Sequence, residues 1–125
     1  MYFLALFFIK ILKSPSKILV IIQRSNGDVL LSTSLVKLLY ESFDHPEIDL
    51  LVNDDTLEIA NIIPFVNNIH IFSYGDKKIN RWNQEKNIML KIFKKYDLSI
   101  NLTASDRSVL YALLASKKSI SAVEF

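Results

Sequence analysis

Apolar residues along the chain gather in five short runs that alternate with longer amphipathic segments. The clearest run, residues 17–22, reads K-I-L-V-I-I, a β-branched stretch typical of a central parallel strand that is buried on both faces. Shorter apolar runs predict further strands at residues 48–52, 69–72, 98–102 and 120–123. We therefore expect one sheet of five strands.

Helices are predicted in the segments between those strands. Apolar periodicity places them at residues 28–43, 56–62 and 81–96, and a last one ends near residue 115. In the long third helix, Trp82 is expected on the apolar side, and Ser105 and Asp106 can cap the last helix. Strands that alternate with helices at this spacing indicate an α/β domain with a parallel sheet and right-handed crossovers.

The first residues of the chain form a separate apolar segment. Residues 1–12 read M-Y-F-L-A-L-F-F-I-K-I-L and are followed by Lys13 and Lys17. The run is shorter than the roughly 20 residues that a helix needs to span a bilayer, and it lacks the features of a signal peptide. It is either an extra helix packed on the domain or an interfacial anchor with lysines facing headgroups. We divide the chain into this extension, residues 1–16, and a domain over residues 17–125.

Composition narrows the chemistry. A chain of 125 residues suits one domain, and half of its residues are hydrophobic. The absence of cysteine excludes disulfides, thiolate zinc sites and a cysteine nucleophile, and it fits a reducing cytosol. The two histidines, His45 and His70, lack metal-ligand spacing, so no metal site is predicted. A net charge of +2 is too small to indicate binding to nucleic acid.

Three loops follow predicted strands and are the expected place for a ligand, because open α/β sheets bind ligands beyond the carboxyl ends of their strands. They are residues 23–28, 73–80 and 103–107. In the first loop, Gly27 permits a tight turn or a close backbone approach, and the following helix N-terminus can bind an anion. With two glycines in the whole chain, neither a G-x-G-x-x-G fingerprint nor a Walker A loop exists.

Asp28 has two competing interpretations. Its position at the start of the first predicted helix favours an N-cap, for which aspartate is a preferred residue. The alternative is a general base, exposed at the end of the sheet, that accepts a proton from a substrate hydroxyl. Both roles use the same carboxylate oxygens, and spacing alone favours the cap.

Two polar groups elsewhere are candidates for ligand contacts. Lys77, Lys78 and Arg81 follow the third strand, where they can meet phosphate or carboxylate groups or form a solvated surface. Asp106 and Arg107, next to Ser105, combine a helix start with a candidate site.

Four stretches, in order, resemble glycosyltransferase family 9. Residues 17–39, K-I-L-V-I-I-Q-R-S-N-G-D-V-L-L-S-T-S-L-V-K-L-L, resemble the family's opening strand, its loop ending in Gly-Asp and its V-L-L-T-T-P helix. Residues 47–53, 63–72 and 96–118 are similar to its second strand, its N-P-Y-V-D segment with the third strand, and its Y-D-L-V-I-D-L-T strand with the helix after it. Asn26 replaces a small or apolar residue of the family, and Ser34 replaces a proline.

The resemblance implies a GT-B fold, in which two Rossmann-like domains face each other across a cleft. This chain would then be the N-terminal, acceptor-side half, with a Rossmann-like parallel sheet, and we expect the donor-binding C-terminal domain to be absent from it. The family transfers heptose from ADP-heptose to the lipopolysaccharide inner core, with inversion and without metal or other cofactor. The resemblance favours Asp28 as the general base. It implies acceptor contacts at Asn26, Gly27, Ser32, Thr33, Lys77, Lys78, Arg81, Ser105, Asp106 and Arg107.

The implied partners are a lipid A–core oligosaccharide acceptor and a nucleotide sugar, with no nucleic acid. We expect a cytoplasmic location with peripheral contact to the inner membrane, and no turnover by this chain alone. Two alternatives remain. One is a non-catalytic α/β module that binds a nucleotide or a partner, and the other is a truncated remnant, inactive unless it pairs with a separately encoded C-terminal half.

Overall fold

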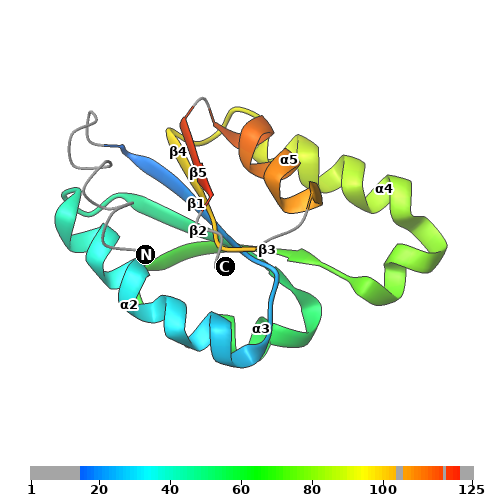
Figure 1. The fold of residues 1–125 in the computed structure, drawn as a ribbon, viewed down its shortest axis with the longest axis horizontal. Helices are drawn as coiled ribbons and strands as arrows, with labels where there is room; N and C mark the ends of the chain where they lie inside the picture. The colour runs from blue at the N-terminus through cyan, green and yellow to red at the C-terminus, as the bar shows by residue number, and fades with distance from the viewer. Residues whose placement is uncertain (1–14, 104–105, 117, 122–125) are drawn as a thin grey trace.

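A computed structural model describes residues 15–103, 106–116 and 118–121, in which five strands form one parallel sheet (Figure 1). The strands are β1 (Lys17–Ile22), β2 (Glu47–Asn53), β3 (Val66–Phe72), β4 (Leu98–Asn101) and β5 (Lys118–Ser121). The helices are α2 (Asn26–Ser42), the 3-10 turn η1 (Asp54–Thr56), α3 (Leu57–Asn61), α4 (Tyr74–Ile92) and α5 (Asp106–Ala115). The predicted α/β fold with a parallel sheet is confirmed.

The strand order β3-β2-β1-β4-β5 places β1 at the centre. From β1 the chain builds outwards through β2 and β3, and then it returns to place β4 on the other side of β1. The order of the strands therefore reverses between β1 and β4. In open sheets of this kind, ligands bind outside the carboxyl ends of the strands at such a reversal. We call that side of the sheet, where β1, β2, β3 and β4 end, the carboxyl edge.

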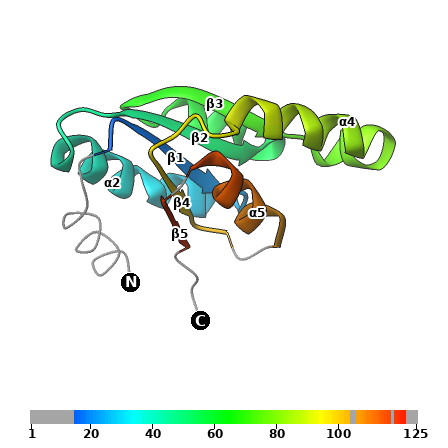
Figure 2. The ribbon, with the colours of Figure 1, turned by 90° about the horizontal axis from the view of Figure 1, so that it is seen from above.

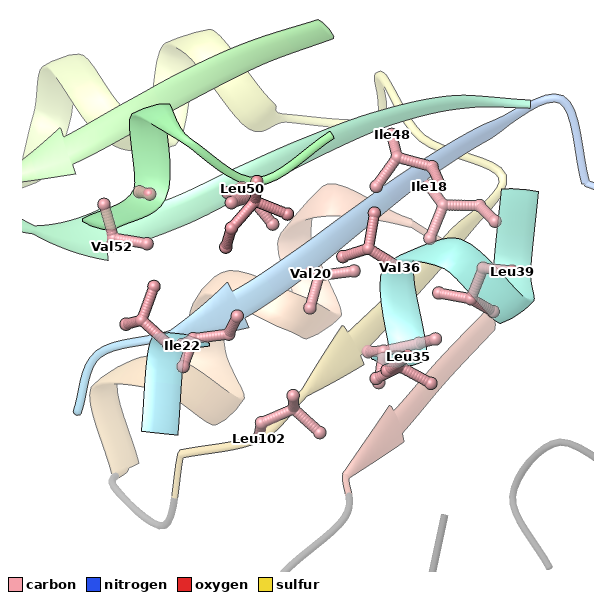
Figure 3. Close-up of a cluster of buried hydrophobic side chains, with 14 of the residues drawn as sticks. Ile18, Val20, Ile22, Leu35, Val36, Leu39, Ile48, Leu50, Val52 and Leu102 are labelled. Carbon is pink, nitrogen blue, oxygen red and sulfur yellow. The ribbon is translucent and has the colours of Figure 1, made fainter. Parts of the chain in front are cut away.

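Helices cover both faces of the sheet, with α2 and α3 on one face and α4 and α5 on the other (Figure 1). Side chains of β1 alternate between the two layers. Ile18, Val20 and Ile22 belong to the cluster under α2 (Figure 3), and Leu19 and Ile21 belong to the cluster under α4 and α5. All five side chains are buried, which explains the continuous apolar run in the sequence.

The long helix differs from its prediction. Residues 73–80 were expected to be a loop, but α4 begins at Tyr74 and ends at Ile92. The carboxamide of Gln84 accepts a hydrogen bond from the backbone amide of Ser73 at 2.7 Å and donates one to its carbonyl oxygen at 2.9 Å. This contact fixes the junction of β3 and α4 through a residue ten positions into the helix, which local polarity does not reveal.

Trp82 was expected on the apolar side of that helix, and this is wrong because its side chain is 81% exposed. The sheet-facing residues are Ile88 and Ile92, which pack in the cluster under α4 and α5. The first part of α4 extends past the sheet (Figure 2), so it has no apolar surface to cover there.

Other boundaries shift by a few residues. The first helix begins two positions earlier than predicted, at Asn26, β3 begins three positions earlier, at Val66, and β5 covers Lys118–Ser121 rather than 120–123. Residues 1–14 of the predicted N-terminal extension lie outside the described residues. No helix in the described part of the chain is long and apolar enough to cross a membrane.

Candidate functional site at the carboxyl edge

The loop after β1 leads directly into α2. Ser25 is the N-cap residue, with extended backbone angles, and its carbonyl oxygen accepts the first helical hydrogen bond from the Val29 amide at 3.0 Å. Asp28 therefore lies in the first turn of the helix, three residues after the cap, and its interpretation as the N-cap is wrong. A carboxylate in the first turn still interacts favourably with the helix dipole.

The Asp28 carboxylate is accessible. Its side chain is 39% exposed, and its Oδ2 accepts hydrogen bonds from Arg24 Nε at 3.1 Å and Ser25 Oγ at 3.0 Å. Both contacts use one oxygen. Within the described part of the chain, the carboxylate makes no hydrogen bond to the amides of its own helix. Two donors thus orient Oδ2, and the side chain as a whole stays partly exposed at the carboxyl edge.

Gly27 does not serve a tight turn. Its φ is not positive, and a Cβ built on it would meet only Ser25 Oγ, at 4.0 Å. Nothing inside the described protein therefore requires glycine here. Ser25 makes no side-chain cap, because its hydroxyl donates to Asp28 instead of accepting from an amide. The remaining prediction for Gly27, and for its neighbour Asn26, which is also exposed, is the close approach of a ligand to the start of α2.

Ser32 and Thr33 lie one turn further along α2. Ser32 is buried, and its hydroxyl donates to the Val29 carbonyl oxygen at 2.5 Å, so the structure does not bring it to the open end of the loop. The hydroxyl oxygen of Thr33 is buried and has no hydrogen-bond partner among the described residues. Their contact with an acceptor stays a prediction.

For the remaining predicted site residues, the structure describes the backbone alone or nothing. Lys77, Lys78 and Arg81 fall within the first part of α4 and Asp106 and Arg107 within the start of α5, but their side chains lie outside the description, as does all of Ser105. The backbone places the first group in the first part of α4, which follows β3, and the second at the start of α5, which follows β4. Their ligand contacts also stay predictions.

A buried hydrogen-bond network joins the ends of β1 and β4. Thr103 Oγ1 accepts from the backbone amide of Gln23 at 2.8 Å, and the Thr103 amide donates to Asn101 Oδ1 at 2.9 Å. Asn101 Nδ2 in turn donates to Ser108 Oγ at 3.0 Å, and Ser108 Oγ donates to the Thr103 carbonyl oxygen at 2.9 Å. This network fixes the position of the loop that carries Asp28, at the point where the strand order reverses.

Sequence reasoning missed the buried polar residues at the strand ends. Gln23 directly follows β1 and is 6% exposed, and Asn53 ends β2 and is 5% exposed. Asn101 ends β4. The signal was present, because each of these apolar runs ends on a carboxamide: K-I-L-V-I-I-Q, I-D-L-L-V-N and L-S-I-N. An unpaired buried carboxamide is unfavourable by roughly 1–3 kcal/mol, so such residues call for an explanation.

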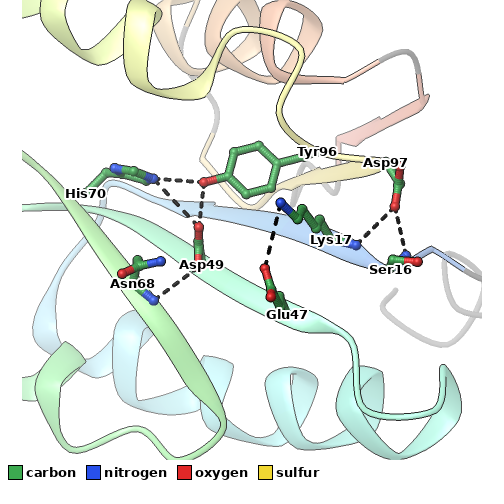
Figure 4. A network of polar contacts seen from close by, with 8 residues as sticks. All are labelled: Ser16, Lys17, Glu47, Asp49, Asn68, His70, Tyr96 and Asp97. Atoms are coloured by element: carbon green, nitrogen blue, oxygen red, sulfur yellow. Dashed lines mark hydrogen bonds and ion pairs between the residues drawn. The ribbon is translucent and has the colours of Figure 1, made fainter.

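A second polar cluster lies away from this edge (Figure 4). The Tyr96 hydroxyl donates to Asp49 Oδ2 at 2.7 Å and lies 2.8 Å from His70 Nε2. The backbone amide of Asn68 donates to Asp49 Oδ1 at 3.0 Å. Because the single proton of Tyr96 goes to Asp49, a neutral His70 donates from Nε2. Burial lowers the pKa of His70, although the Asp49 carboxylate, 3.9 Å away, opposes this. Burial and the bond to Asp49 raise the pKa of Tyr96.

Among the described residues, no group of three or more His, Asp and Glu side chains could hold a metal ion. The chemistry that these residues offer at the carboxyl edge is therefore that of an accessible carboxylate, an open helix N-terminus and neutral carboxamides.

No protein-family model matches the chain. In sequence, it is 32% identical over 85 residues to lipopolysaccharide heptosyltransferase 3 of Escherichia coli strain K12, and the match covers 65% of this chain and 24% of that protein. Another Escherichia coli lipopolysaccharide heptosyltransferase 3 is 31% identical over 85 residues, with the same coverage. The chain thus spans about a quarter of the length of the curated relatives that it matches.

The fold comparison agrees. A glycosyl transferase family 9 protein from Veillonella parvula DSM 2008 superimposes with a TM-score of 0.74 at 18% identity, covering 88% of this chain and 32% of that one. Escherichia coli heptosyltransferase WaaC, solved with ADP-2-deoxy-2-fluoro heptose, gives 0.69 at 14% identity, covering 86% and 36%. Identities this low show a shared fold alone. The sequence similarity to heptosyltransferase 3 is a separate observation that points to the same group of proteins. The resemblance to glycosyltransferase family 9 is confirmed.

Proposed function

We propose that this chain forms the acceptor-binding half of an inverting lipopolysaccharide glycosyltransferase, because part of its sequence is similar to heptosyltransferase 3 and its fold is similar to that of a glycosyltransferase family 9 protein. The observation that carries the proposal is the accessible Asp28 carboxylate in the first turn of α2, after the central strand, oriented through Oδ2 by Arg24 and Ser25. General-base catalysis needs such a group within hydrogen-bond reach of the hydroxyl that reacts.

In the proposed reaction, Asp28 accepts the proton of an acceptor hydroxyl while that oxygen attacks the anomeric carbon of ADP-heptose. The new glycosidic bond forms on the face opposite ADP, the bond from the anomeric carbon to the phosphate oxygen breaks, and ADP leaves with the electron pair. Arg24 and Ser25 keep the carboxylate in place by donating to Oδ2. No metal or other cofactor takes part in this scheme.

The donor sugar is proposed to bind mainly to a second Rossmann-like domain, outside the domain described above. Because leaving-group contacts and closure over the substrate would come from that domain, we expect no turnover by the chain alone. A C-terminal half would supply them. The acceptor is a lipid A–core oligosaccharide, so the proposed place of action is the cytoplasmic face of the inner membrane. Lys77, Lys78 and Arg81 lie in the first part of α4, which follows β3, and their positive charge suits an anionic acceptor.

The test is a titration of the isotope-labelled chain, followed by NMR, with deacylated lipopolysaccharide core oligosaccharide and separately with ADP-heptose. We expect the oligosaccharide to shift the backbone amides of Ser25, Gly27 and Asp28, and ADP-heptose alone to leave them unchanged. Binding of ADP-heptose alone at this loop, without binding of the oligosaccharide, would contradict the acceptor role and favour a nucleotide-binding module.

A further inference from the structure

Two buried carboxamides at the carboxyl edge have polar atoms without partners. Gln23 Nε2, Gln23 Oε1 and Asn53 Oδ1 are buried and make no hydrogen bond with the described residues. Both side chains are more than nine-tenths buried. Leaving such atoms unpaired lowers stability, and apolar side chains of similar size would avoid this.

The fold brings the two carboxamides together. The register pairs Ile22 with Val52, and Gln23 and Asn53 come next on these neighbouring strands. In each strand the preceding odd-numbered residues, Ile21 and Leu51, pack in the cluster under α4 and α5. Alternation along the strands therefore directs Gln23 and Asn53 to the same face, beside the point where the strand order reverses.

Asn101 shows that a carboxamide at this edge can be fully bonded. It ends β4 on the other side of β1 and is completely buried, yet its Nδ2 donates to Ser108 and its Oδ1 accepts from the Thr103 amide. Burial at this edge therefore does not by itself leave a carboxamide without hydrogen bonds, although Asn101 pairs with Ile21 and so lies two positions before the level of Gln23. Gln23 and Asn53, in contrast, have polar atoms for which the described residues supply no partner.

We propose that Gln23 and Asn53 form a carboxamide pair that binds hydroxyl groups of the acceptor sugar; the choice of ligand rests on the proposed function. A carboxamide both donates and accepts, which matches a sugar hydroxyl, and it carries no charge that would select a phosphate. Gln23 is followed by the exposed residues Arg24 and Ser25, so rotation about its side-chain bonds moves the carboxamide towards the open end of β1. That rotation breaks no hydrogen bond of the side chain with the described residues. Its backbone bond to Thr103 stays in place.

The experiment compares Gln23→Met and Asn53→Leu with Asn101→Leu, a matched carboxamide whose bonds are all inside the protein. Thermal unfolding is measured for each, and binding of deacylated lipopolysaccharide core oligosaccharide is measured by NMR titration. We expect Gln23→Met and Asn53→Leu to keep or raise the unfolding midpoint, by up to about 5 °C, and to weaken oligosaccharide binding about three- to tenfold. Asn101→Leu should lower the midpoint by several degrees. Gln23→Leu, with a shorter apolar side chain, repeats the test if methionine packs badly.

Two results would overturn this inference and leave the proposed function unaffected. Unchanged oligosaccharide affinity in Gln23→Met and Asn53→Leu would show that the pair does not contact the sugar. A midpoint that falls in Gln23→Met and Gln23→Leu as far as in Asn101→Leu would show that the carboxamide has an internal structural partner, such as a buried water. If the unsubstituted protein does not bind the oligosaccharide at all, the proposed acceptor role fails, and this inference fails with it.

Discussion

The two ends of the sheet differ in how completely their polar side chains are hydrogen-bonded within the protein. At the end where the strands begin, Asp97 Oδ2 accepts from the amides of Ser16 and Lys17 at 2.8 and 3.1 Å (Figure 4), which ties the start of β1 to the start of β4. At the carboxyl edge, the amides of α2 lack a side-chain cap, and Gln23 has unpaired polar atoms. Polar groups that are satisfied internally stabilise the fold, whereas groups left open at a strand reversal are available to a ligand.

The largest expected effect is on catalysis at the open end. In a mixture of this chain with a separately produced donor-binding domain, we expect Asp28→Asn to lower heptosyl transfer by about 10²–10⁴-fold, because the amide cannot take up the acceptor proton. ADP release from ADP-heptose in the presence of core oligosaccharide is the measurement. Asp55→Asn, the same change at an exposed aspartate after β2, is the control and should retain activity. Equal activity of Asp28→Asn and the unsubstituted chain would rule out the general-base role.

The next effect is on stability at the opposite end. Asp97→Ala removes the acceptor for two backbone amides, and hydrogen bonds to a charged group contribute more than neutral ones. We expect the free energy of unfolding in urea to fall by about 2 kcal/mol, with oligosaccharide binding unchanged. Glu58→Ala, at an exposed position on α3, removes the same charge and should have little effect. A loss of binding without a loss of stability would contradict the division of roles between the two ends.

The same contrast explains what could be predicted from sequence. The strand β1 was predicted at its observed bounds, because a run of five consecutive residues buried on both faces has few alternatives. The role of Asp28 depended on more than local spacing. Ser25 and Asp28 are both favoured N-cap residues three positions apart, and the choice depends on where the chain leaves the sheet. That point is set by the hydrogen bond from Gln23 to Thr103, which lies 80 residues further along.

The start of α4 and the unpaired carboxamides escaped prediction for the same reason. Gln84 fixes the β3–α4 junction through a contact that polar composition does not reveal. Asn101 finds its partners in the Ser108 hydroxyl on α5 and the nearby Thr103 amide, whereas the Gln23 side chain finds none among the described residues, and strand periodicity does not distinguish the two.

The smallest expected effect is a dependence of stability on pH that arises from His70. Burial lowers the pKa of this imidazole in the folded state, so the unfolded chain binds its proton more readily. By linkage, the contribution of His70 is fully present above its ordinary pKa of about 6.5 and is lost as the pH falls below that value. Protonation favours the unfolded state because the cation is poorly solvated beside β2, and Lys91 and Lys95 add repulsion.

Urea unfolding between pH 7.5 and pH 5 should therefore show a loss of stability that is smaller in His70→Asn. His45→Asn is the matched control, since His45 stacks on Tyr40 near the end of α2 and outside this cluster. If both variants kept the same pH dependence as the unsubstituted protein, the Asp49–Tyr96–His70 cluster would not be its source.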